Sequence, residues 1–119
     1  MQTMIRSSIV FLLLVCSAFA ADISGTWVLQ VETSAGSGTP TFTFKQDAGK
    51  LTGHYAGALG EAAVTGTVNG EKVEFSFKAS PGGEEITVTY KGTITEPGKM
   101  KGTAKLGTLG EGTWAGSKK

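Results

Sequence analysis

Beyond Ala21, apolar and polar side chains alternate along the chain, and this alternation constrains the fold more than any other feature. Phe42 and Phe44, for example, alternate with Thr and Lys neighbours. A period of two residues is typical of strands with one buried face, whereas a helix has a period near 3.6. The pattern predicts eight strands, and the residues on their inward faces are Trp27, Leu29 and Val31; Phe42 and Phe44; Leu51, Gly53 and Tyr55; Val64, Gly66 and Val68; Val73, Phe75 and Phe77; Ile86, Val88, Tyr90, Gly92 and Ile94; Met100, Gly102, Ala104 and Leu106; Gly112, Trp114 and Gly116.

Seven short segments between these strands have turn compositions. Asn69-Gly70 is the clearest, because this pair suits the type I′ turn of a two-residue hairpin. Short turns join successive strands into an antiparallel meander, and a meander of eight strands removes its exposed edges by closing. We therefore predict an all-β fold, an eight-stranded antiparallel up-and-down meander barrel, with an open sandwich as the alternative. The predicted turns are residues 34–39, 47–49, 58–61, 69–70, 80–84, 96–98 and 107–111.

A weak internal repeat supports closure. KLTG at residues 50–53 recurs as KMKG at 99–102, and LGE at residues 59–61 recurs at 109–111. GTW occurs both in the first strand, at residues 25–27, and in the last, at residues 112–114. The repeat favours a pseudo-symmetric barrel. Such a barrel must pair its first strand with its last.

The first twenty residues have the composition of an export signal. Arg6 precedes an apolar run over residues 9–15, and residues 18–20 present small side chains at the positions that a signal peptidase reads. The run is too short to span a bilayer, which takes about 20 residues. Cys16 suggests a lipoprotein, although Val15 before it is not the small residue that such processing needs. We predict a signal peptide at residues 1–20, one domain at residues 21–119, a periplasmic or secreted location and no membrane-spanning segment.

The predicted mature chain of roughly 99 residues is large enough to fold alone. It contains no Cys, so packing and strand pairing must stabilise it without disulfides. The only Arg, Arg6, leaves with the signal peptide, and Lys residues alone balance the 10 acidic residues. A domain without Arg or a strong basic patch is poorly suited to phosphate recognition, so no nucleic-acid partner is expected.

Two short motifs resemble those of known proteins. ISGTW at residues 23–27 and GKLTGHY at residues 49–55 resemble the opening of streptavidin- and avidin-like proteins, and the Gly-x-Trp pattern resembles the calycin superfamily, which includes the lipocalins. The chain also looks like small secreted lipocalin-like domains of bacteria. The resemblance implies that Trp27 plugs one end of the barrel beneath a basic residue of the last strand, here Lys118. Biotin is not expected, because Leu29 and Gly57 stand where avidin-like proteins have polar ligand contacts.

Few residues are suited to catalysis or metal binding. His54 is the only His, it points outward by alternation, and no Cys or second His is available to join it in a zinc site. Glu61 and Glu111 occupy equivalent turns and could suggest a glycosidase pair, but short turns build no cleft. No Gly-x-Ser-x-Gly motif occurs. We expect no enzyme activity, no catalytic residue, no metal and no cofactor.

The inward aromatic residues are therefore the main candidates for function. An eight-stranded barrel encloses room for side chains or for one small ligand, and the sequence leaves both outcomes open. Tyr55 and Tyr90 could supply the few polar groups of an apolar pocket. The favoured prediction is an exported non-enzymatic module that holds a small apolar ligand. The alternative is a filled barrel that binds a protein partner through end loops such as residues 34–38, as exported protease inhibitors do. The predicted lining residues are Trp27, Phe44, Tyr55, Phe75, Tyr90 and Trp114.

Overall fold

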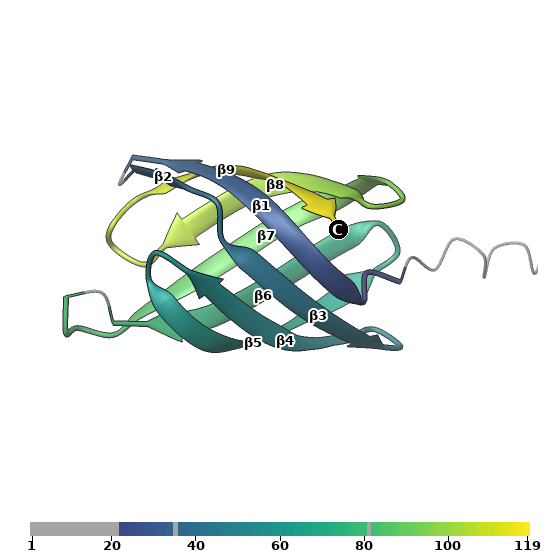
Figure 1. Cartoon of the computed structure of the whole chain (residues 1–119), viewed down its shortest axis with the longest axis horizontal. Coiled ribbons are helices and arrows are strands. Elements are labelled where there is room, and N and C mark those ends of the chain that lie inside the picture. The colour runs from purple at the N-terminus through teal and green to yellow at the C-terminus, as the bar shows by residue number, and fades with distance from the viewer. Residues whose placement is uncertain (1–21, 35, 81) are drawn as a thin grey trace, which may run out of the picture.

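The structure, a computed structural model, describes residues 22–34, 36–80 and 82–119. The predicted signal peptide, residues 1–20, and its cleavage site before Ala21 lie outside this range. Within it the chain forms strands, and no helix there is long and apolar enough to cross a membrane. The strands, drawn in Figure 1, are β1 (Gly25–Thr33), β2 (Gly36–Gly38), β3 (Thr41–Asp47), β4 (Lys50–Gly57), β5 (Gly60–Asn69), β6 (Lys72–Ala79), β7 (Ile86–Glu96), β8 (Lys99–Leu106) and β9 (Glu111–Lys118).

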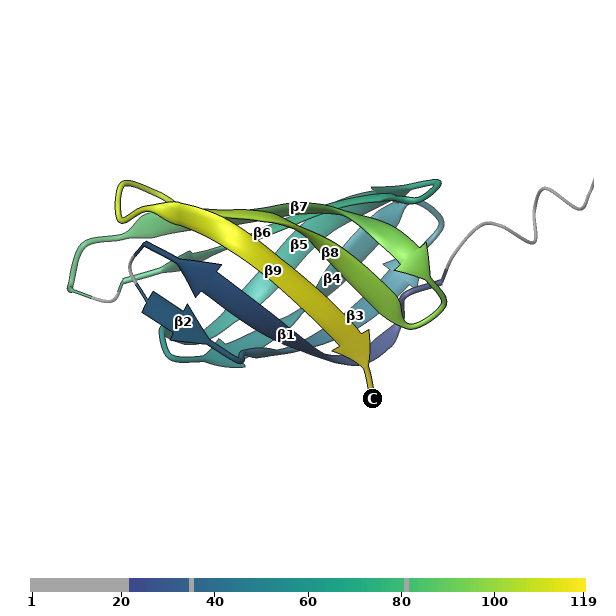
Figure 2. The same cartoon turned by 90° about the horizontal axis from the view of Figure 1, so that it is seen from above.

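Eight of these strands close into one antiparallel barrel. From β3 to β9 each strand pairs with the next along the chain, and β1 pairs with both β3 and β9. Trp27 lies opposite Lys118, and Val31 lies opposite Trp114, so the first and last strands meet along most of their length. Figure 2 shows β9 running beside β1. The predicted up-and-down barrel is confirmed, and the open sandwich is wrong.

The predicted turn at residues 34–39 is wrong in part, because it contains β2. Gly36 and Gly38 lie opposite Thr33 and Val31 at the end of β1, while β3 pairs with the start of that strand. β2 and β3 therefore form one interrupted partner for β1. The interruption includes Pro40, which has no N–H to donate to a ladder but accepts a 3.0 Å hydrogen bond from the backbone of Leu29.

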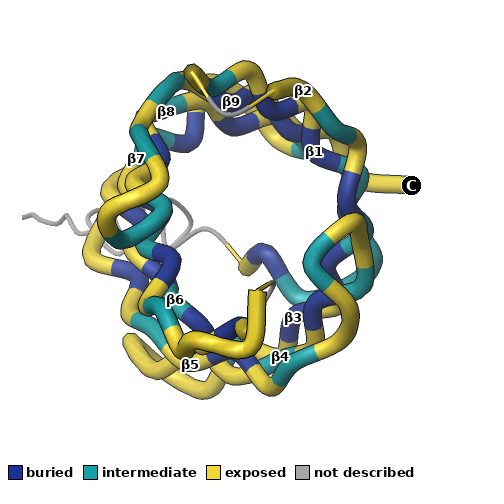
Figure 3. Tube along the Cα trace, turned by 90° about the vertical axis from the view of Figure 1, so that its left-hand side faces the viewer, coloured by how far each residue is buried: buried dark blue, intermediate teal, exposed yellow. Residues whose placement is uncertain are grey.

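The barrel has two different ends (Figure 1). The connections after β1, β4, β6 and β8 lie at one end, here called the loop end. The connections after β3, β5 and β7 lie at the other, the terminal end, together with residues 22–24 and the C-terminus. Figure 3, a view into the loop end, shows buried positions on strands all around the ring. These positions carry the core side chains, since alternate residues of each strand face the interior.

The terminal end is closed by the segment before β1. Ile23 is buried; its carbonyl accepts a 2.8 Å hydrogen bond from Nε1 of Trp27, and its N–H donates a 2.9 Å bond to Oε1 of Gln46. The side chain of Lys118 packs against Gly25, where any Cβ would meet its Cε at 2.7 Å. The calycin resemblance implied that Trp27 lies beneath Lys118; here Trp27 is buried, and the Lys118 side chain covers Gly25 at the start of the same strand.

Two inward glycines show why the sheet can coil so tightly. A Cβ on Gly66 would collide with the carbonyl oxygen of Glu74, and one on Gly102 would collide with that of Lys91. The neighbouring strand passes so close at these positions that only a hydrogen atom fits. In-strand glycine is therefore a requirement of closure here, as the sequence indicated.

Candidate functional site

Five of the six predicted lining residues lie together in the middle of the barrel. The ring of Phe75 stacks on that of Tyr90 with centroids 5.1 Å apart, and it meets the edge of Trp114 at 5.8 Å and of Phe44 at 4.9 Å. Tyr55 joins this group through two rings that were not among the predicted lining residues, Phe42 and Phe77. The sixth residue, Trp27, lies toward the terminal end and makes no ring contact with the others in the part of the chain described.

These side chains pack against one another. All six predicted residues are between 1% and 3% exposed. Tyr55 and Phe77 stack face to face with their centroids 4.1 Å apart, which leaves no room for a third ring between them. A ligand at this depth must displace a side chain, so the route by which it enters is as important as the lining.

The polar groups of the core are unequally satisfied. Trp27 and Trp114 each donate from Nε1 to a backbone carbonyl, at 2.8 and 2.9 Å. The Tyr55 hydroxyl accepts a 3.2 Å hydrogen bond from the backbone N–H of Leu59. The Tyr90 hydroxyl makes no hydrogen bond with any residue that the structure describes. Burial raises the pKa of Tyr90, and electrostatic interaction with Tyr55 raises it further, so this hydroxyl keeps its proton.

The loop end is less well covered than the terminal end. Four apolar side chains that pack on the core are only partly buried, and all four lie at the loop end: Leu59, Ala62, Ile86 and Leu106. Leu109, in the turn between β8 and β9, is 48% exposed. The incompletely covered apolar surface of the core is therefore concentrated at one end.

Two neighbouring strands also separate at this end. The register between β5 and β6 stops at Thr65 and Ser76; beyond these residues β5 pairs with β4 alone and β6 pairs with β7 alone. A depression of about 430 Å³ lies over the separation, which we call the β5–β6 opening. The residues that line it are Glu61, Ala62, Ala63, Thr65, Ser76, Phe77, Lys78 and Thr87.

Alternation placed Phe77 inside the barrel without marking it as part of a site, and Ala62, just after a predicted turn, was not among the predicted inward residues. Ala62 lies opposite Tyr55, and Phe77 is the ring that stacks on Tyr55. The opening therefore leads to the aromatic cluster through Phe77. Alternation gives the face of a strand on which a residue lies, but it does not report where two strands part, so no sequence signal could single out these residues.

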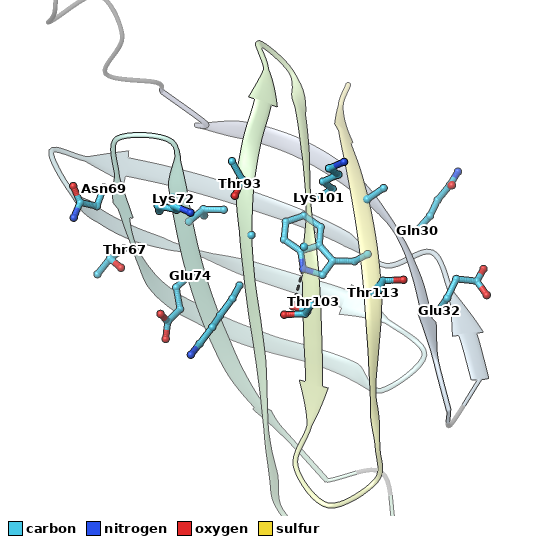
Figure 4. Close-up of a pocket in the computed structure, with 16 residues that line it drawn as sticks. Gln30, Glu32, Thr67, Asn69, Lys72, Glu74, Thr93, Lys101, Thr103 and Thr113 are labelled. Carbon is cyan, nitrogen blue, oxygen red and sulfur yellow. Dashed lines mark hydrogen bonds between the residues drawn. The ribbon is translucent and has the colours of Figure 1, made fainter.

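A second depression, of about 990 Å³, lies on the outer surface of β1 and β5 to β9 (Figure 4). Most of its lining side chains are exposed and polar, and Lys91 lies opposite Glu74 across it. Trp114 is the one predicted lining residue that borders it. The strands beneath this depression are paired with their neighbours, so no break in the wall of the barrel leads from it to the core.

The candidate catalytic residues lie on the surface. Nε2 of His54 is 2.9 Å from Oε1 of Glu61, and the two side chains are 52% and 73% exposed. Glu111 begins β9 opposite Lys105. No group of three His, Cys, Asp or Glu side chains suited to a metal ion occurs in residues 22–34, 36–80 and 82–119. The His54–Glu61 pair is a surface contact between neighbouring strands of the kind that contributes little to stability.

Comparison with protein families found no match, and comparison with curated proteins found none either. Solved structures do match. A redesigned β-barrel, mFAP1, bound to DFHBI, superposes with a TM-score of 0.60 at 14% identity over 82% of this chain and 94% of that one. EF1p2_mFAP2b bound to DFHBI gives 0.57 at 14% identity over 82% and 93%. At this identity the likeness establishes the fold alone: an eight-stranded antiparallel β-barrel.

Proposed function

We propose that the protein is an exported, non-enzymatic binding barrel that takes up a small apolar molecule through the β5–β6 opening. The observation that carries the proposal is the end of the β5–β6 register above Phe77. At this place the wall of the barrel is interrupted next to an aromatic side chain that belongs to the core.

The surroundings of the opening favour an apolar ligand. Its inner side is formed by Ala62 and Phe77, and Tyr55 lies behind them. A flat ligand that displaced the Phe77 ring would stack on Tyr55 in its place and exchange one aromatic contact for another. The remaining gain comes from the apolar surface that the ligand buries, roughly 25 cal/mol per Å².

Three further points support the proposal. The two designed barrels that share this fold are each described as bound to DFHBI, a small molecule. Export rests on the signal-like composition of residues 1–20. The absence of enzyme activity rests on the sequence, because the predicted mature chain, residues 21–119, offers His54 no second His and no Cys to act with it.

The test uses ethylbenzene as a probe and two matched variants. Ala62 and Ala63 are neighbours in β5, but Ala62 is partly buried opposite Tyr55, while Ala63 is exposed opposite His54. We expect ethylbenzene to shift the amide signals of residues around Phe77 in a saturable NMR titration. Ala62→Leu should weaken this binding about tenfold, because the added methyl groups fill the entrance. Ala63→Leu should bind as the unmodified protein does.

Two results would overturn the proposal. One is the absence of any saturable shift in the unmodified protein. The other is equal binding by both variants with shifts that map elsewhere, which would place the site away from the opening. Well-dispersed amide spectra of both variants without probe provide the control for folding.

A further inference from the structure

One polar side chain in the interior stands apart from the rest. Of the four polar aromatic groups in the core, those of Trp27, Trp114 and Tyr55 each have a hydrogen-bond partner. The hydroxyl of Tyr90 has none among the described residues, although the side chain is only 3% exposed. A buried polar group without a partner costs free energy, so native proteins retain few of them, and such a group often belongs to a site.

We propose that the Tyr90 hydroxyl is the polar anchor of the ligand, and that the ligand carries one uncharged hydrogen-bond acceptor, such as a ketone, ester or ether oxygen. The proposal rests on the binding function proposed above and adds the chemical class of the ligand. It assigns to Tyr90 the role of donor.

The position of Tyr90 suits this role. Its ring is held between neighbours, stacked on Phe75 at 5.1 Å and edge-on to Phe42 at 5.4 Å, so the hydroxyl direction is fixed. The Tyr90 ring lies 6.3 Å from that of Phe77, the residue that borders the β5–β6 opening. A molecule that displaced Phe77 would therefore reach the neighbourhood of Tyr90.

The chemistry of the core selects an uncharged acceptor. Burial keeps the pKa of Tyr90 above its ordinary value, so at neutral pH the group is a hydroxyl that can donate. No charged or strongly polar side chain is buried among the residues described, so a carboxylate or ammonium ligand would lose its hydration without gaining a counter-ion. A neutral oxygen can accept a hydrogen bond from the Tyr90 hydroxyl at a much smaller desolvation cost.

The experiment compares two probes of nearly equal shape, acetophenone and ethylbenzene, which differ by the carbonyl oxygen. Each is titrated by NMR into the unmodified protein, Tyr90→Phe and Tyr55→Phe. The informative quantity is the change in the ratio of the two dissociation constants from the unmodified protein to each variant, because the difference in water solubility is the same for every protein and cancels in that change. We expect Tyr90→Phe to weaken the binding of acetophenone relative to that of ethylbenzene roughly three- to tenfold, which is the effect of losing one hydrogen bond.

Tyr55→Phe is the matched control. The proposal assigns the donor role to Tyr90 alone, so loss of the Tyr55 hydroxyl, whose oxygen accepts a hydrogen bond from Leu59, should leave the ratio nearly unchanged. An infrared measurement gives a second readout: the carbonyl band of bound acetophenone should lie at lower frequency in the unmodified protein than in Tyr90→Phe, because only the former donates a hydrogen bond to it.

The outcomes separate this proposal from the proposed function. If ethylbenzene binds but the ratio is the same in the unmodified protein and in Tyr90→Phe, the barrel binds apolar molecules and the assignment of Tyr90 is wrong. If the ratio changes in Tyr55→Phe instead, the anchor is Tyr55 and the proposal is overturned. If neither probe binds to the unmodified protein, both the binding function and the anchor are overturned.

Discussion

Tyr55 and Tyr90 are equally buried, yet their hydroxyl groups have different surroundings. Tyr55 accepts a hydrogen bond from the backbone of Leu59, whereas Tyr90 has no such partner in the described part of the chain. Removing an unsatisfied buried hydroxyl should stabilise the ligand-free fold, and removing a satisfied one should destabilise it. We expect Tyr90→Phe to raise the free energy of unfolding by about 1 kcal/mol and Tyr55→Phe to lower it by about 1 kcal/mol, measured by urea denaturation. A loss of stability in Tyr90→Phe would show that its hydroxyl is bonded.

The same residue should make the protein sensitive to alkali. Folding raises the pKa of Tyr90, because burial disfavours the phenolate. The unfolded chain, in which a Tyr has a pKa near 10, then loses the proton first as the pH rises. Titration of Tyr90 therefore leaves the free energy of unfolding unchanged below about pH 10. Above that pH it lowers the free energy of unfolding, by at most about 1.4 kcal/mol per pH unit. Urea denaturation between pH 8 and pH 11.5 should show that the free energy of unfolding declines less steeply in Tyr90→Phe than in the unmodified protein. An identical decline in both proteins would contradict the raised pKa of Tyr90.

At the scale of the strand, glycine decides how closely neighbouring strands approach. A methyl group on Gly102 would meet the carbonyl of Lys91 on β7, and neither backbone can move without breaking the ladder. We expect Gly102→Ala to lower the free energy of unfolding by about 3 kcal/mol or more. Gly82→Ala is the control, because nothing lies within 4 Å of a Cβ there, and it should change stability by less than about 0.5 kcal/mol. Thermal unfolding of both variants checks the difference.

Alternation predicted the barrel strands because a side chain that faces the core differs in kind from one that faces water. β2 escaped prediction, since Gly36, Ser37 and Gly38 offer no alternating apolar side chain and resemble a loop in composition. The β5–β6 opening was not predicted either, because there the alternation continues although the strand pairing ends. Phe77 and Ala62 keep the inward pattern of their strands after the register has ended, so the sequence continues unchanged across the place where the strands separate.

The six predicted lining residues also show that alternation gives the face of a strand but not the position of a side chain within the barrel. Alternation placed all of them inside the barrel, and the structure agrees. It could not show that Trp27 lies toward the terminal end, apart from the cluster around Phe75, because depth along the barrel axis depends on strand tilt and register. Nor could it distinguish the hydrogen-bonded hydroxyl of Tyr55 from that of Tyr90.

At the scale of the whole molecule, closure was predictable from the sequence because the first and last strands share GTW and closing is the most economical way for an eight-stranded meander to remove its edges. Export remains a prediction. Protein recovered from the periplasm or medium of its natural host should have the mass of residues 21–119, and native mass spectrometry should show a small-molecule adduct that denaturation removes. A mass that includes residues 1–20 would contradict the predicted cleavage, and a bare mass would leave the probes above as the test of binding.

The ladder between β1 and β9 has a consequence for the order of events in folding. It joins residues that are far apart in the sequence, such as Thr33 with Gly112 and Trp27 with Lys118. Contacts so distant in sequence form slowly, and this one cannot form until the last eight-residue strand has been synthesised. Until then the backbone N–H and C=O groups that β9 will pair with on β1 and β8 are free to pair with strands of other chains. A protein shortened before Glu111 should therefore associate with its own copies instead of closing, and the final strand determines whether the chain forms a closed barrel or an aggregate.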